Sequence, residues 1–334
     1  MHWIILWAFL QLWGRDSAIS PVCELSNTVG IKTYPRTPSG MTQLFADIVA
    51  SGKSPWDTPA LYVHLGRDAH NTQRLLARWY PQHAEKILAL LKVLPQEHSG
   101  LLLHPGIAAR FTEFEKFAKD FVKKSPKADA WELKEAFSKS LGTRKVYRGL
   151  MLTSSEAQSI AQNGLEARGL MDKNKAVDAL TDAFNPDDKS SATDSFRPVG
   201  ALWARTRPKV AEKDTLAEDV LANSIAQSVT EYPLVADSAA SYAPSTQDGS
   251  QAGKSLYRIT LELPELDIIK STGLFKDTVK ESRRPFILEG KDYGSLAENP
   301  GLEQFVFFNV GPTAIEKVER IDTKPPKLSF GPER

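Results

Sequence analysis

The chain has 334 residues, of which 41% are hydrophobic and 25% are charged, a composition ordinary for a globular protein with a sizeable core. Its formal net charge is +1, and no basic stripe with interleaved aromatic residues occurs, which argues against a nucleic-acid partner. The single cysteine, Cys23, excludes an intrachain disulfide and a metal site built from clustered thiolates.

The N-terminal segment, residues 1–20, contains a short apolar run from Trp3 to Trp13. The run is too short to span a bilayer, and its length suits the hydrophobic region of a secretory signal. However, no lysine or arginine precedes it, and cleavage after Ala18 would place Asp16 where a small residue is wanted. This weak signal favours a secreted or translocated protein. A packed helix or a misassigned start, and with them a cytoplasmic location, are the alternatives.

Helical periodicity dominates the next segment, residues 24–140, which we expect to form a helical N-terminal subdomain. Apolar residues recur there at spacings of three and four, and the clearest stripe consists of Phe111, Phe114, Phe117 and Phe121. A stripe of this kind predicts a helix face buried in a core. Lys123, Lys124 and Lys127 follow it and are typical of a solvated helix end.

The pattern changes at Lys145. Residues 146–150 read as a short strand, and Thr153 with Glu156 forms a capping box that opens a helix. Asn163-Gly164 predicts the end of that helix. Residues 185–198 are rich in Asp, Ser and Pro, which indicates a loop or a disordered insert. Thr215 and Glu218 suggest a second capping box and a helix to about Ala222.

Beyond Ser228 the apolar residues alternate with a period of two. Strands are predicted over residues 256–269 with a break at Pro264, over Phe305–Phe308, and over Ile315–Ile321. The tail, residues 324–334, holds three prolines and is expected to be loose. The predicted fold class is therefore α+β, a helical N-terminal segment followed by a strand-rich domain at residues 141–323.

The common motifs for catalysis and phosphate binding are missing. No G-x-G-x-x-G and no H-E-x-x-H occurs, and the six histidines lack ligand spacing. Two stretches, Gly52-Lys53-Ser54 and Gly253-Lys254-Ser255, resemble the end of a phosphate loop. Each has an aspartate where the first glycine is required, so we interpret both as chance matches.

Three distant segments do carry polar residues in a suggestive order. Arg148 lies in the predicted strand Val-Tyr-Arg-Gly, and Ser228-Val229-Thr230 precedes a predicted helix that is rich in alanine. Glu303 stands before the apolar strand, which Gly311-Pro312-Thr313 follows. Each feature alone has a simple structural explanation, such as an ion pair or a solvated strand end. Their order and context together are what indicate a function.

This order resembles the arginine–serine–glutamate class of mono-ADP-ribosyltransferases, which includes vertebrate ecto-enzymes and many bacterial toxins and effectors. In that family an aromatic-Arg-Gly strand comes first, then a Ser-Thr-Ser strand with an alanine-punctuated helix, then the catalytic glutamate before a hydrophobic strand. Ser228 and Thr230 match the first and third positions of the second motif, with Val229 between them. The resemblance covers roughly residues 145–321 and implies the split mixed β-sandwich of the family.

The resemblance implies NAD⁺ as co-substrate, without a metal. Glu303 would hydrogen-bond the ribose 2′-hydroxyl and stabilise the oxocarbenium-like ribose as nicotinamide leaves. Arg148 would bind the pyrophosphate, since a guanidinium can donate two parallel hydrogen bonds to it. Ser228 would steady Glu303 and the nicotinamide ribose, with Thr230 beside it, and the backbone of Gly149 would bind the nicotinamide amide.

One position departs from the family pattern. Transferases that modify arginine usually carry a glutamate two residues before the catalytic one, and others carry a glutamine, whereas this chain has Gly301. The nature of the acceptor residue therefore stays open. Tyr293, in the segment before Glu303, is the candidate aromatic for contact with the acceptor substrate.

Three hypotheses follow. The first is a mono-ADP-ribosyltransferase, such as an exported effector, with an unidentified protein target. The second is an NAD⁺ glycohydrolase on the same fold, which Gly301 favours somewhat because water needs no acceptor-binding side chain. The third is a catalytically silent module that binds NAD or a protein, and the presence of Glu303 argues against it.

Overall fold

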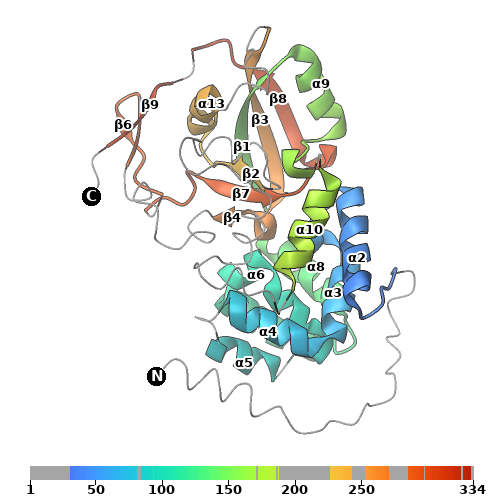
Figure 1. Cartoon of the computed structure of the whole chain (residues 1–334). Helices are drawn as coiled ribbons and strands as arrows, with labels where there is room; N and C mark the ends of the chain where they lie inside the picture. Colours follow the sequence, from blue (N-terminus) through green and yellow to red (C-terminus); the bar gives the residue numbers. More distant parts are fainter. Residues whose placement is uncertain are drawn as a thin grey trace, which may run out of the picture.

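A computed structural model of the chain describes residues 31–80, 84–92, 94–170, 172–185, 187, 226–242, 253–270, 285–296, 298–324 and 326–331. The apolar run at Trp3–Trp13 and the predicted capping box at Thr215 lie outside these residues, as does almost all of the predicted insert at residues 185–198. Figure 1 shows the N-terminal helices, in blue to teal, below the strands, with later helices beside the strands.

The N-terminal part of the chain is helical, as the periodicity predicts. Its helices are α2 (Pro38–Ser51), α3 (Pro59–Arg67), α4 (Ala69–Trp79), α5 (Ala84–Leu91), α6 (Pro105–Ala109), α7 (Phe111–Lys124) and α8 (Ala130–Leu141), with 3₁₀ segments η1 (Pro55–Asp57) and η3 (Gln96–Leu103). Proline at the first turn favours several of these starts. On α7, Phe111 and Phe114 are buried and Phe117 and Phe121 pack against the core, which confirms the predicted stripe.

Strands begin just after α8. The first sheet joins β1 (Thr143–Leu152), β3 (Ser255–Pro264) and β8 (Ile315–Arg320) in the order β1-β3-β8. The second joins β2 (Ala226–Val229), β7 (Gln304–Phe307) and β4 (Ile269–Lys270) in the order β2-β7-β4. The α+β class is thereby confirmed. The strand pairs described are all antiparallel, however, where a mixed sheet was expected.

Further elements surround the two sheets. They are α9 (Ser154–Asn163), η4 (Arg168–Leu170), α10 (Lys173–Ala183), α13 (Pro233–Tyr242), η5 (Glu265–Asp267) and η7 (Pro312–Ala314). The predicted capping box of Thr153 and Glu156 opens α9, and Gly164 ends it with a φ of 94°. A third sheet contains β5 (Phe286–Leu288), β6 (Lys291–Asp292) and β9 (Leu328–Phe330).

The tail at residues 324–334 is not loose throughout, contrary to the prediction. Strand β9 pairs antiparallel with β5, with Phe286 opposite Phe330 and Leu288 opposite Leu328. The prolines of the tail suggested an unstructured end, but they lie outside this strand and so do not interrupt its pairing.

The main hydrophobic core extends from the helices into the second sheet. It includes most of the buried helical residues, and also Leu266 of η5, Ile269 of β4, and Phe305, Phe307 and Phe308 of the β7 segment. A smaller core lies between the two sheets and includes Val146, Val229, Ile259 and Val306. Strand β7, which follows Glu303, therefore packs against the helical core on one face and against the core between the sheets on the other. Within the described residues, no helix is long and apolar enough to cross a bilayer.

Candidate active site

Arg148 lies near the middle of β1 and reaches toward the second sheet. Side chains alternate along a strand, so Arg148 shares its face with Val146 and with its cross-strand partner Ile259, both buried. Its guanidinium Nη1 donates a hydrogen bond of 3.2 Å to the carbonyl oxygen of Ser228. The arginine is half-buried, so it presents a cation that is partly removed from water.

The Ser228–Thr230 segment is joined to β1 directly. Tyr147 and Thr230 exchange two backbone hydrogen bonds, with N···O distances of 2.7 and 2.9 Å. This bridge connects the two sheets at one point and places Arg148 beside Ser228. The predicted helix after the motif is α13, so the local order of strand and helix is as expected.

Glu303 comes next to Ser228 through the pairing of β2 with β7. Ser228 is opposite Phe305, and Val229 is opposite Gln304. Glu303 immediately precedes β7, and strand alternation places it on the same face as Phe305 and hence as Ser228. Such diagonal neighbours lie about 7–8 Å apart between Cα atoms. Ser228 thus lies on the face of β2 and β7 that Phe305 presents to the helical core, whereas Arg148 lies among the residues between the two sheets and contacts Ser228 through its carbonyl oxygen.

The carboxylate of Glu303 has an unusual environment. Its side chain is half-buried, and no hydrogen bond or ion pair joins it to any residue that the structure describes. Burial raises the pKa of Glu303 from 4.5 to about 7, because the charged form loses hydration without a compensating partner. A carboxyl group in this state is costly for the fold and is typical of groups that act on a bound substrate.

Gly149 has a clear structural role next to Arg148. A Cβ atom at this position would lie 1.9 Å from the carbonyl oxygen of Ala236 in α13, so only glycine allows the helix to approach β1 this closely. The helix is held there by Asp237, whose buried carboxylate accepts two hydrogen bonds from the guanidinium of Arg258 on β3. The predicted contact of the Gly149 backbone with nicotinamide stays a prediction.

Tyr293 lies on the segment that leads to Glu303, and its ring contacts Tyr232, two residues beyond the second motif. Its ring packs edge-on against that of Tyr232, with centroids 5.4 Å apart. The hydroxyl of Tyr232 and the side-chain amide of Asn299 are hydrogen-bonded, and the Thr230 hydroxyl donates to the carbonyl oxygen of Gly301 at 3.0 Å. Tyr293, Asn299 and Gly301 are therefore fastened to the connection between β2 and α13.

Gly301 lies against a carboxylate that the sequence did not single out. A Cβ atom at position 301 would be 2.8 Å from Oε2 of Glu231, and the backbone N–H of Glu231 donates to the carbonyl oxygen of Gly301 at 2.9 Å. Glu231 also pairs with Arg144 of β1 and accepts a hydrogen bond of 2.8 Å from the side-chain amide of Gln304. The space that a side chain at 301 would need is thus filled by Glu231.

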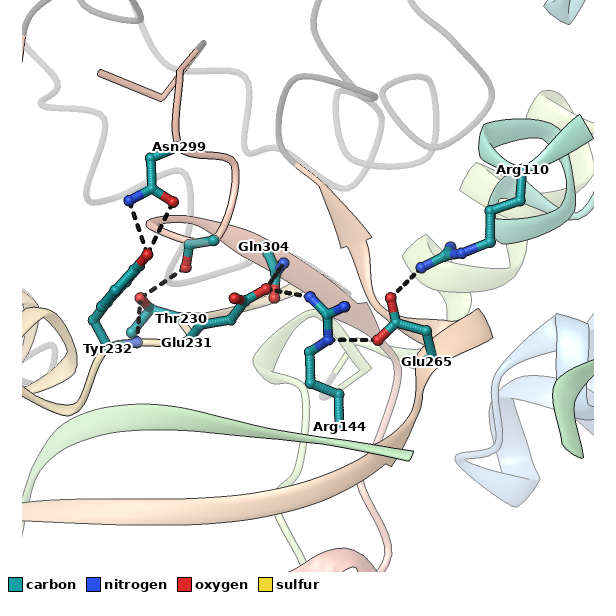
Figure 2. A network of polar contacts seen from close by, with 9 residues as sticks. Arg110, Arg144, Thr230, Glu231, Tyr232, Glu265, Asn299 and Gln304 are labelled. Carbon is teal, nitrogen blue, oxygen red and sulfur yellow. Dashed lines mark hydrogen bonds and ion pairs between the residues drawn. The ribbon is translucent and has the colours of Figure 1, made fainter. Parts of the chain in front are cut away.

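Figure 2 shows that these contacts continue toward the helices. The guanidinium of Arg144 lies between two carboxylates, Glu231 and Glu265, with 2.6 Å between its Nε and Oε2 of Glu265. Glu265 also pairs with Arg110, which precedes α7. We call Arg110, Glu265, Arg144 and Glu231 the charge chain. Sequence reasoning missed it because its members have no common local pattern, although Glu231 directly follows the Ser228–Thr230 motif.

A cavity of about 340 Å³ lies away from this site, among the helices. Its lining includes Arg36, Tyr62, Arg67, Glu97 and Trp131, and none of the sequence-predicted site residues. Among the described residues, no group of three His, Cys, Asp or Glu side chains could hold a metal ion.

Comparison with known proteins gives no relative for this chain. No protein-family model matches it, and neither a curated protein nor a solved structure is significantly similar.

Proposed function

We propose that this chain cleaves the nicotinamide–ribose bond of NAD⁺ and transfers ADP-ribose to a protein acceptor, as a mono-ADP-ribosyltransferase of the arginine–serine–glutamate type. The observation that carries the proposal is the junction of β1, β2 and β7, where Arg148 contacts the Ser228 carbonyl oxygen and β2 pairs with the strand that follows Glu303. The three segments are distant in sequence, and nothing in their local patterns requires them to meet.

The chemistry suits these side chains. The C1′–N bond of the nicotinamide riboside breaks, the electron pair leaves with nicotinamide, and positive charge develops on the ribose. The carboxylate of Glu303 stabilises that charge best in its ionised form, where it also accepts a hydrogen bond from the 2′-hydroxyl. The guanidinium of Arg148 binds the pyrophosphate and so holds the dinucleotide across the junction. The acceptor atom then bonds to C1′ and releases its proton.

The state of Glu303 supports this role. A neighbouring positive charge strongly stabilises the ionised form of a carboxylate that has no partner and a pKa near 7. The cationic nicotinamide ring and the developing oxocarbenium ion supply that charge. Because the gain is greatest in the transition state, it lowers the barrier and does not merely tighten binding.

The second candidate function is NAD⁺ glycohydrolysis, in which water attacks C1′. Gly301 supports it, because position 301 offers no side chain to an acceptor and its space is filled by Glu231. The two functions share the first step and differ only in the fate of ADP-ribose.

The first test is nicotinamide release from NAD⁺ by the wild type and by Glu303→Gln. The substitution keeps the shape of the side chain and removes its charge, so we expect a loss of at least about a hundredfold, or about 2.7 kcal/mol of transition-state stabilisation. Glu316→Gln is a matched control, because Glu316 is an exposed partner of Lys145 on β8. Absence of turnover together with absence of NAD⁺ binding by the wild type would refute the proposal.

Radiolabelled NAD⁺ separates the two functions. Label on the chain itself or on added lysate proteins indicates a transferase. Free ADP-ribose in the same amount as nicotinamide, with no labelled protein, indicates a glycohydrolase.

A further inference from the structure

Glu231 holds both ends of the short segment that contains Glu303. Its backbone N–H donates to the carbonyl oxygen of Gly301, and its side-chain Oε1 accepts from the Nε2 atom of Gln304. Glu303 lies between these two anchor points, and it has no hydrogen-bonding partner of its own among the described residues. Its position is therefore determined by the residues on either side, and Glu231 contacts both of them, Gly301 at the backbone and Gln304 at the side chain.

Both anchors are well placed to be rigid. Gln304 is 1% exposed, and its buried Oε1 has no hydrogen-bond partner among the described residues, so the bond from its Nε2 to Glu231 is what orients its amide. Gly301 leaves just enough room for the Glu231 carboxylate, since a Cβ there would approach within 2.8 Å of Oε2. The Thr230 hydroxyl, from the residue preceding Glu231, donates a second hydrogen bond to the Gly301 carbonyl.

The charge chain holds the Glu231 carboxylate in turn. Arg144 is oriented by Glu265 at 2.6 Å, and Glu265 is held by Arg110, with Glu265 13% and Arg110 16% exposed at the side chain. Two cations alternate with two anions, so each charge has a partner of opposite sign and the group is neutral overall. A partly buried, alternating group of this kind is stronger than an isolated surface pair.

We propose that Glu231 is a positioning residue, which through Gly301 and Gln304 fixes the Glu303 carboxylate for reaction and which the charge chain connects to the helical part of the molecule. This inference rests on the proposed function for its catalytic meaning. Glu231 acts through its neighbours and does not itself touch the reacting ribose, whereas Glu303 does. The helices at Arg110 thereby support the geometry of the site from a distance.

The kinetic test compares Glu231→Ala with the wild type, using Glu316→Ala as the matched control. We expect kcat for nicotinamide release to fall by about a hundredfold, since a displaced catalytic group costs that much. KM for NAD⁺ should stay within about twofold, because the Arg148 contact to the pyrophosphate is retained. Glu231→Gln keeps an acceptor oxygen for Gln304 and should lose much less. Equal turnover in Glu231→Ala and Glu316→Ala would overturn the proposal, as would a rise in KM that matched the fall in kcat.

A second measurement does not depend on turnover. Carbon-13 NMR of glutamate-labelled protein follows the titration of Glu303, which is assigned by its absence in Glu303→Gln. If Glu231 holds the segment closed, Glu231→Ala admits water and lowers the Glu303 midpoint by about one pH unit or more. Gln304→Leu, which removes the same side-chain contact from the other side, serves here if Glu231→Ala does not fold. An unchanged midpoint refutes positioning, whereas a lowered midpoint in a chain that never releases nicotinamide refutes the proposed function alone.

Discussion

At the scale of single residues, the ionised form of Glu303 that the proposed reaction needs is the form that destabilises the folded chain. Burial raises its pKa to about 7, so the folded chain binds this proton more tightly than the unfolded chain does. Below pH 4.5 the carboxyl is protonated in both states and carries no penalty. As pH rises from about 4.5 to about 7, the unfolded state ionises first, and the free energy of unfolding falls.

The first prediction concerns the stability that the fold gains when Glu303 cannot ionise. Glu303→Gln should be more stable than the wild type at pH 8, by about 2 kcal/mol, which is less than the full shift implies because the side chain keeps some contact with water. The difference should vanish near pH 4, where both side chains are neutral. Urea unfolding of the two proteins at pH 4, 6 and 8 measures it. A wild type that is more stable than Glu303→Gln at pH 8 would contradict the raised pKa.

The second prediction concerns the rate. In the proposed function the ionised form of Glu303 is the active one, so kcat/KM for nicotinamide release should rise with pH through a midpoint near 7, which reports the free enzyme. The midpoint of kcat should be lower, because bound NAD⁺ brings the cationic nicotinamide ring near the carboxylate. Initial rates between pH 5 and 9 test both. A kcat/KM that is flat across this range would assign the essential carboxylate elsewhere.

Single residues also mark the limit of what the sequence could predict. Arg148, Ser228 and Glu303 could be proposed as site residues because each lies in a recognisable local pattern. Glu231 was not, because its importance depends on contact with Gly301 and Gln304, which lie in a distant segment and meet it only in the folded chain. The absence of a side chain at position 301 could be read from the sequence, but the carboxylate that fills the space could not.

At the scale of elements, the close packing of α13 on β1 gives a third prediction. Gly149→Ala places a methyl group against the carbonyl oxygen of Ala236 and should cost about 1–3 kcal/mol through overpacking. Gly311 is the matched control, since its φ is −64° and the nearest atom to a Cβ there is 4.0 Å away. Gly311→Ala should stay within about 1 kcal/mol of the wild type. Denaturant unfolding of the three proteins compares them, and equal stabilities would mean that α13 does not lie this close to β1.

Element type was predictable where the signal is local. The capping box at Thr153 and the break of β3 at Pro264 both appear where the sequence placed them. Strand β9 was missed because its formation depends on pairing with β5, and such pairing is not encoded within the tail itself. The expected mixed sheet was a property of the family resemblance, and local patterns offered no check on strand direction.

At the scale of the whole molecule, the helices and the second sheet share one core. Leu266, Phe305 and Phe308 pack into the same buried cluster as α7 and α8, although the sequence suggested a helical subdomain ending at residue 140. Helix α8 ends at Leu141 and β1 begins at Thr143, so the change of element type is as predicted, while the core continues across it. Apolar side chains before and after residue 142 therefore bury one another.

The last prediction is that this shared core opens as one unit. Amide hydrogens of α7, α8 and β7 should exchange through a common opening, with equal free energies and equal urea dependence. The small sheet of β5, β6 and β9 lies outside this cluster and should exchange faster, which provides an internal contrast. Native-state exchange followed by NMR resolves these groups. If β7 opened with a free energy more than about 1 kcal/mol below that of α7 and α8, Glu303 would be mounted on a separately mobile sheet. The support that we assign to the helices would then have to come from the charge chain alone.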